Sequence, residues 1–165
     1  MKNALTFENV TMLGKGIVKH VSDDDVHAFT SATLPLPENM LIHNRMIIKG
    51  DVFHSAEYVR PTRSNDTVVM LNNGKFGVIK KIVIYKDETG KNVPMIMIQN
   101  LPNDSCVSHF KDILLNADIS SIKLCNDIDL ECSLIDVTEI NCKCVFVSAN
   151  NKSFVINFPN RFEKD

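Results

Sequence analysis

TVVMLNNGKFGVIKKIVIYKDETGKNVPMIMIQNL, residues 67–101, is the stretch that decides the fold of this 165-residue chain. Two tight turns interrupt long apolar runs that are rich in β-branched residues. Such runs, bounded by Asn, Asp and Gly, are typical of antiparallel strands. The stretch predicts a three-stranded meander over Thr67–Leu71, Lys75–Tyr85 and Val93–Leu101.

The turns and the middle strand of this meander are the clearest local features. Asn72-Asn73-Gly74 predicts a tight hairpin, because Asn-Gly tolerates the positive φ angles that such a turn needs. Asp87–Gly90 predicts the second turn. The middle strand is apolar on both faces at residues 82–84, which indicates a central position in the sheet.

Further strands are predicted on both sides of the meander. Before it they are Ile17–His20, Met46–Lys49 and Asp51–Tyr58; after it they are Leu130–Ile135, Cys142–Ser148 and Ser153–Phe158, the last two joined by a hairpin turn. The predicted fold is therefore mainly β: a small, twisted, partly closed antiparallel barrel with short peripheral helices.

Helices are predicted only at the rim. Ser22 before three aspartates favours a capped helix over Asp23–Ser31, and adjacent carboxylates fit a helix start better than a metal loop. Apolar spacing predicts a second helix over Ser105–Asn116, and Asp136–Ile140 a single turn. We expect an N-terminal arm over residues 1–42, packed on a β-barrel-like domain over 43–165.

Composition limits the function. Net charge is -2, and the chain has no tryptophan and two tyrosines, which disfavours aromatic ligand cages. No apolar run approaches the roughly 20 residues of a membrane span. Five cysteines, an odd number without a CxxC pair, predict free thiols in a reducing compartment.

Charge is distributed unevenly along the chain. Residues 43–81 carry seven Lys or Arg against three acids, a net charge of +4, whereas residues 104–139 carry eight acids against two Lys, a net charge of -6. These halves either attract each other within one fold or form two surfaces with different partners.

The motifs that could support catalysis or metal binding are weak. A Cys106/His109 dyad lacks any nucleophile signature. Cys142-x-Cys144 could join Cys125 or Cys132 around zinc, but its spacing favours core packing. Residues 127–131 place three acids on one face of an extended segment, which favours a solvated face or a docking site for a basic peptide. Gly14-Lys15-Gly16 fits no nucleotide motif. We expect no enzyme, no cofactor and no metal.

Val137–Val147, VTEINCKCVFV, supports a family resemblance. Ile140, Lys143 and Cys144 resemble the I-x-x-K-C-x-V stretch of bromo-adjacent homology (BAH) domains, with Phe146 in place of the final valine. The wider layout resembles a C-terminal β-domain of animal DNA-transposon-derived proteins, and the matching pieces are Met12–Lys15, Arg45–Tyr58, Gly77–Ile79 and Pro159–Asp165.

The resemblance implies a non-catalytic, BAH-like chromatin- or protein-binding module in the nucleus, with a histone or another nuclear protein as partner. It does not imply transposase chemistry or membrane attachment. Because tryptophans and clustered tyrosines are missing, a methyl-lysine cage is not expected.

The predicted binding surface is the basic loop and hairpin. Phosphates or an acidic peptide could meet its cations, and aromatic rings could stack on bases. An ordinary solvated hairpin and a nucleic-acid-contacting domain that uses the basic 45–81 face are the alternatives. The candidate binding residues are Tyr58, Arg60, Arg63, Lys75, Phe76, Lys80 and Lys81.

Overall fold

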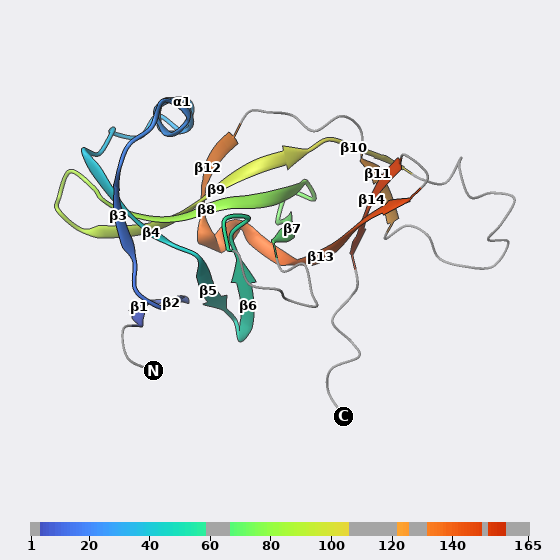
Figure 1. Cartoon of the computed structure of the whole chain (residues 1–165), viewed down its shortest axis with the longest axis horizontal. Coiled ribbons are helices and arrows are strands. Elements are labelled where there is room, and N and C mark those ends of the chain that lie inside the picture. The colour runs from blue at the N-terminus through green and yellow to red at the C-terminus, as the bar shows by residue number, and fades with distance from the viewer. Residues whose placement is uncertain (1–3, 59–66, 106–121, 126–131, 150–151, 158–165) are drawn as a thin grey trace, which may run out of the picture.

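A computed structural model describes residues 4–58, 67–105, 122–125, 132–149 and 152–157. These residues form a mainly β protein with two antiparallel sheets and one α-helix (Figure 1). The smaller sheet has the strand order β1-β2-β5-β6. Its strands are β1 (Leu5–Phe7), β2 (Val10–Leu13), β5 (Arg45–Ile48) and β6 (Asp51–His54).

The larger sheet is built around β8 (Phe76–Lys86). β9 (Asn92–Leu101) pairs with β8 along one edge, and β12 (Cys132–Asp136) lies beyond it. β7 (Val68–Leu71) and β4 (Asn39–His43) share the other edge, with β3 (Ile17–His20) outside β4. The predicted central position of β8, the middle strand of the meander, is confirmed.

A bulge interrupts β8 at the point where its pairing with β7 ends and its pairing with β4 begins. The register with β9 shifts between Ile79 and Lys81. At this gap the Ile79 N–H donates to the Thr67 carbonyl at 2.8 Å, and the Ala56 N–H donates to the Ile79 carbonyl at 2.7 Å. The loops before β7 and after β6 therefore satisfy the backbone groups that no neighbouring strand reaches.

Beyond β7 the strand order of the larger sheet leads back to the end of β9, which pairs with β8. Its order continues through β13 (Ile140–Ala149), β14 (Lys152–Asn157), β11 (Ile122–Cys125) and β10 (Asn103–Ser105). Pro102 alone separates β10 from β9, so the pairing order returns to where it began. Among the described strands, however, neither sheet closes into a barrel.

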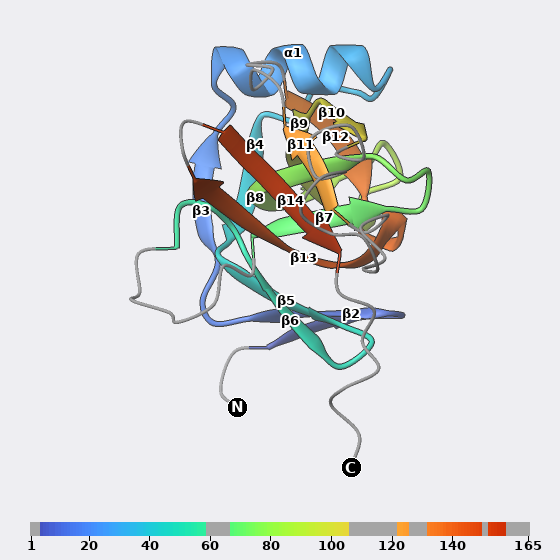
Figure 2. The same cartoon turned by 90° about the vertical axis from the view of Figure 1, so that its right-hand side faces the viewer.

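The molecule has three layers (Figure 2). Helix α1 (Asp23–Ser31) covers one face of the larger sheet and contacts β12, while β2, β5 and β6 lie on the opposite side. The core on the small-sheet side contains residues from both sheets, including Met12, Met46, Ile79 and Ile96. A second core lies under α1 around Phe29, and a third lies between β7, β8, β13 and β14.

Local patterns predicted most of these elements. The meander, the C-terminal hairpin, the 3₁₀ turn η1 (Val137–Glu139) and the Ser22 cap of α1 are confirmed. The cap is a full capping box, because Ser22 and Asp25 satisfy each other's backbone N–H groups.

Several expectations differ from the structure. β1, β2 and β4 were not predicted, because they are short and lack clear alternation. The expected strand over Asp51–Tyr58 ends at His54. Ser105, the expected start of the second helix, is a strand residue in β10, and the rest of that helix lies outside the described residues.

The expected domain boundary lies within a strand rather than in a loop. A division between residues 42 and 43 falls inside β4. The segment expected as an arm supplies β1 and β2 to the smaller sheet and β3 to the larger one.

Candidate functional site

The seven predicted binding residues do not form one basic face in the described part of the chain. Arg60 and Arg63 lie outside the described residues. Lys75 is exposed beside the β7–β8 turn, as expected. Phe76 is only 3% exposed and packs in the third core, so its ring is not presented for base stacking.

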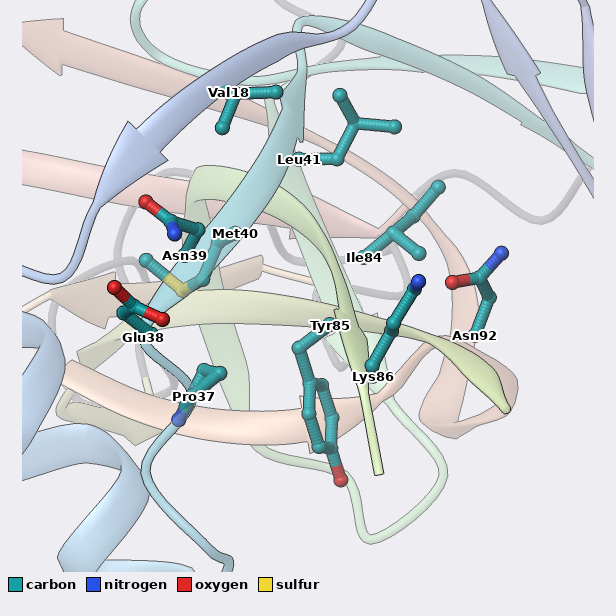
Figure 3. Close-up of a pocket in the computed structure, with 10 residues that line it drawn as sticks. All are labelled: Val18, Pro37, Glu38, Asn39, Met40, Leu41, Ile84, Tyr85, Lys86 and Asn92. Carbon is teal, nitrogen blue, oxygen red and sulfur yellow. The ribbon is translucent and has the colours of Figure 1, made fainter. Parts of the chain in front are cut away.

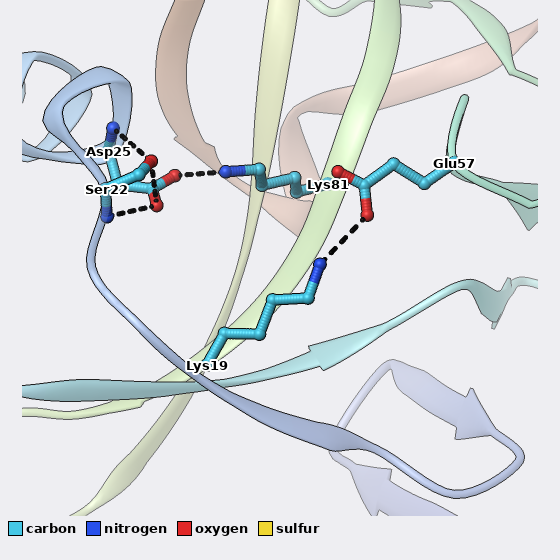
Figure 4. Close-up of polar contacts among 5 residues, drawn as sticks. All are labelled: Lys19, Ser22, Asp25, Glu57 and Lys81. Carbon is cyan, nitrogen blue, oxygen red and sulfur yellow. Dashed lines mark hydrogen bonds and ion pairs between the residues drawn. The ribbon is translucent and has the colours of Figure 1, made fainter.

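Lys81 is engaged by the capped helix (Figure 4). Its Nζ lies 2.7 Å from Oδ1 of Asp25, whose side chain is 2% exposed, while the side chain of Lys81 is 19% exposed. Burial acts to raise the pKa of Asp25, but hydrogen bonds from Lys81 and Ser22 outweigh it and lower the pKa below its ordinary value. Lys81 is therefore part of a buried ion pair rather than a free docking cation.

Lys80 faces the same region. The charges of Lys80 and Asp24 both act on the half-buried thiol of Cys132, whose pKa burial raises. The charges of both adjacent lysines and of two aspartates at the start of α1 therefore act on the same thiol, whereas the ion pair with α1 is made by Lys81. The acids that meet this part of the basic segment come from the helix cap, a pairing that no sequence pattern indicated.

Tyr58 is held by neighbours from its own chain. Its ring stacks on His54 with centroids 4.7 Å apart and planes 8° apart. The Arg45 guanidinium lies 5.3 Å from the Tyr58 ring centroid. This His54–Tyr58–Arg45 group joins β5 and β6 to the segment after them.

A groove at the opposite end of β8 was not predicted (Figure 3). It has a volume of about 490 Å³ and lies where β3, β4 and β8 run side by side. Val18, Leu41 and Ile84 are successive partners across these strands, so their side chains form one apolar row. Val18, the outermost member, is 68% exposed.

The groove has a polar rim and an apolar floor. Glu38, Asn39, Lys86 and Asn92 line its margin, with opposite charges on its two sides. Tyr85, the next residue along β8, also borders the groove, but its ring points to the other face of the sheet and is buried against Phe29 under α1, where burial raises the pKa of its hydroxyl.

β3 is an edge strand among the strands that the structure describes. Its partner is β4, and the pairing order of the larger sheet ends at β3. Ile17 is 55% exposed beside the exposed Val18, and the two point to opposite faces of the sheet. Exposed apolar residues on an edge strand are uncommon, because such edges pair readily with other chains. The sequence feature that could have indicated this surface is the adjacent apolar pair Ile17-Val18. It lies in the strand Ile17–His20, which was predicted correctly.

A second hollow lies beside the β7–β8 hairpin. It has a volume of about 530 Å³ and is lined by residues 73–76 and 100–102. Lys75 is its cationic group. A single exposed lysine beside this hollow defines no ligand, so the β3 groove is the better-defined surface.

Two buried polar side chains lie where the chain passes between the sheets. Within the described part of the chain, the side chains of His43 and Ser55 make no hydrogen bond of ordinary geometry. Burial lowers the pKa of His43, and contact with the Leu13 backbone only partly offsets this. Gly16 lies against the ring, since a Cβ there would stand 2.7 Å from Nε2. This packing leaves His43 neutral and enclosed.

The thiols separate into two groups. Cys132 packs beside the core under α1, whereas Cys142 and Cys144 belong to the third core. A hydrogen bond from Cys144 lowers the pKa of Cys142 to about 7, and the same contact raises the pKa of Cys144. The zinc set with Cys132 is therefore not assembled, and Cys125 has no described side chain.

Side-chain clusters and helices in the described part of the chain bear on metal binding and on membrane spans. There, no three His, Cys, Asp or Glu side chains gather into a metal-binding group. None of the described helices is long and apolar enough to cross a membrane. The acids of 127–131 and the dyad of Cys106 and His109 lie outside the described residues.

Comparison with known proteins gives no relative. No family model, curated protein or solved structure matches this chain.

Proposed function

We propose that this chain is a non-catalytic interaction module that binds an extended segment of a nuclear protein along β3. The observation that carries the proposal is the edge strand with its exposed Ile17 and Val18 beside the apolar groove. A partner strand added to β3 would gain backbone hydrogen bonds, and its alternate side chains would continue the row that Val18 begins.

The chemistry of the groove favours a peptide over nucleic acid. Its floor is apolar, and its rim carries Glu38 as well as Lys86. A phosphate backbone would instead require clustered cations. Of the cations expected to serve that role, Lys81 is paired with Asp25.

The proposal includes a BAH-like, transposon-derived origin. Two observations support it. The stretch with Ile140, Lys143 and Cys144 lies on β13, a late strand entered directly from the single turn η1. The strands around the third core also have a pairing order that returns to Pro102, as in a small barrel that is not fully closed.

Peptide selection tests the proposal. The purified chain is used to select from a displayed library of random linear peptides and from a set of histone-tail peptides. We expect bound peptides to carry apolar residues at alternate positions. Val18→Gln should weaken their binding by about tenfold, as loss of a central contact does. Val145→Gln is the matched control, because Val145 is also an exposed strand valine, on β13.

Two results would overturn the proposal. One is peptides that bind the Val18→Gln variant as tightly as the unaltered chain. The other is an absence of bound peptides together with binding of a DNA duplex that weakens steeply with salt, which would favour the nucleic-acid alternative.

A further inference from the structure

The first half of β13 brings three sulfur atoms to one face of the larger sheet. Cys142 and Cys144 are two residues apart on the strand, so their side chains point the same way. Met70 on β7 is the direct cross-strand partner of Cys142. All three side chains belong to the third core or pack against it.

Hydrogen bonds bring these sulfur atoms into one group. Cys142 and Cys144 share one face of β13, and their thiols influence each other, which lowers the pKa of Cys142 to about 7 and raises the pKa of Cys144. The Cys142 thiol donates to Oδ1 of Asn157 at 3.2 Å, and Nδ2 of the same amide lies 3.6 Å from Sδ of Met70. Asn157 on β14 is in turn the cross-strand partner of Cys144.

The group is buried at one side and accessible at the other. Cys144 is 2% exposed, whereas Cys142, Met70 and Asn157 are half-buried. The surroundings are apolar, with Phe76 and Val155 in the same core. A small ion could therefore approach past Cys142 and Met70 and be held away from water.

The donor types decide which ion fits. Thiolate and thioether sulfur are soft ligands that select Cu(I), whereas zinc sites use thiolate, imidazole and carboxylate but not thioether. We propose that Cys142, Cys144 and Met70 form a binding site for Cu(I), with Asn157 as the outer contact that orients two of the sulfurs. Each cysteine that binds would release its thiol proton to water, and the copper would keep its oxidation state.

Competition for Cu(I) tests this site in the whole chain. The reduced protein is titrated without oxygen against a coloured Cu(I) chelator, and X-ray absorption counts the sulfur ligands. We expect one ion bound by three sulfurs. Cys142→Ser should weaken binding by more than about 100-fold, beyond the roughly 10–100-fold typical of losing an outer contact. Met70→Leu, which preserves volume, should weaken it by about tenfold.

Cys132→Ser is the matched control, because Cys132 is also half-buried but packs beside a different core. Thermal unfolding of each variant shows that it is folded. Unchanged Cu(I) affinity in both Cys142→Ser and Met70→Leu would overturn the proposal. So would tighter binding of Zn²⁺ that is insensitive to Met70→Leu. The peptide-binding proposal does not depend on either result.

Discussion

Lys81 and Asp25 are 56 residues apart in the sequence and 2.7 Å apart in the structure. Asp25 has two roles, since its carboxylate closes the capping box with Ser22 and also accepts from Lys81. The sequence predicted the Ser22 cap and the acidic first turn that surround the first role, because a cap depends on residues three positions away. It placed Lys81 on a binding surface instead, because nothing local shows which acid faces a lysine on β8.

Replacing Lys81 should lower the unfolding free energy, because the buried charge of Asp25 then has no ion-pair partner. Lys81→Met leaves a carboxylate that is almost fully buried with no cation beside it. We expect a loss of about 3 kcal/mol in unfolding free energy at pH 7, the lower end of the range for broken buried pairs. Urea denaturation measures it. Lys19→Met should cost less than about 0.5 kcal/mol, because the Lys19–Glu57 pair is exposed (Figure 4).

The pH dependence has a definite sign. The folded-state pKa of Asp25 is lowered, so its stabilisation is present above the unfolded-state pKa and is lost as the pH falls through the folded-state pKa. In Lys81→Met, burial raises the pKa of Asp25 and the lysine no longer lowers it. The loss of unfolding free energy relative to the unaltered chain should therefore become smaller as the pH falls below 4. An equal deficit at pH 3 and pH 7 would contradict the assigned pairing.

β8 shows what an element requires beyond its own pattern. Its apolar run predicted a central strand, but the bulge at Ile79 and the division of one edge between β7 and β4 depend on strands distant in sequence. Gly77 illustrates the same point. A Cβ there would stand 2.6 Å from Cγ1 of Ile98 and 3.0 Å from the Gln99 carbonyl oxygen. This glycine is needed for close packing across β8 and β9.

Gly77→Ala should therefore destabilise the protein. Ile98 is fully buried and has little room to move, so we expect a loss of about 1–3 kcal/mol from overpacking. Thermal unfolding measures the change, and Ile98→Val in the same chain should restore part of it. Gly74→Asn is the control, because Gly74 has φ +78° with open space around it and asparagine tolerates that conformation. A neutral Gly77→Ala would show that the strands can separate slightly at this point.

At the scale of the whole molecule, one core joins the two sheets. Met12 and Met46 of the smaller sheet pack with Ile79 and Ile96 of the larger one, and all four are fully buried. The N-terminal strands, which the sequence predicted as an arm packed on the domain, therefore contribute to its core. Short strands such as β2 gain their stability from this shared core rather than from their own residues.

Met12→Ala tests the unity of the fold. We expect a loss of about 2–5 kcal/mol, the usual range for a buried methionine, with one cooperative transition by both circular dichroism and calorimetry. Leu5→Ala on β1 is the control, since Leu5 is 43% exposed and should cost well under half as much. A separate early transition in Met12→Ala would indicate that the smaller sheet unfolds alone.

The sequence by itself determined the features that depend on neighbouring residues. These are the mainly β class, the turns at Gly74 and Gly90, the capped start of α1 and the hairpin of β13 and β14. Each follows from backbone preferences or side-chain periodicity within a few positions.

Only the tertiary structure decided which surfaces and groups are available. It placed Phe76 in a core, paired Lys81 with Asp25, left β3 at an edge and brought Met70 beside Cys142. The physical reason is that strand pairing joins residues far apart in the chain. One-residue changes of register, such as the bulge at Ile79, then decide which face each side chain occupies.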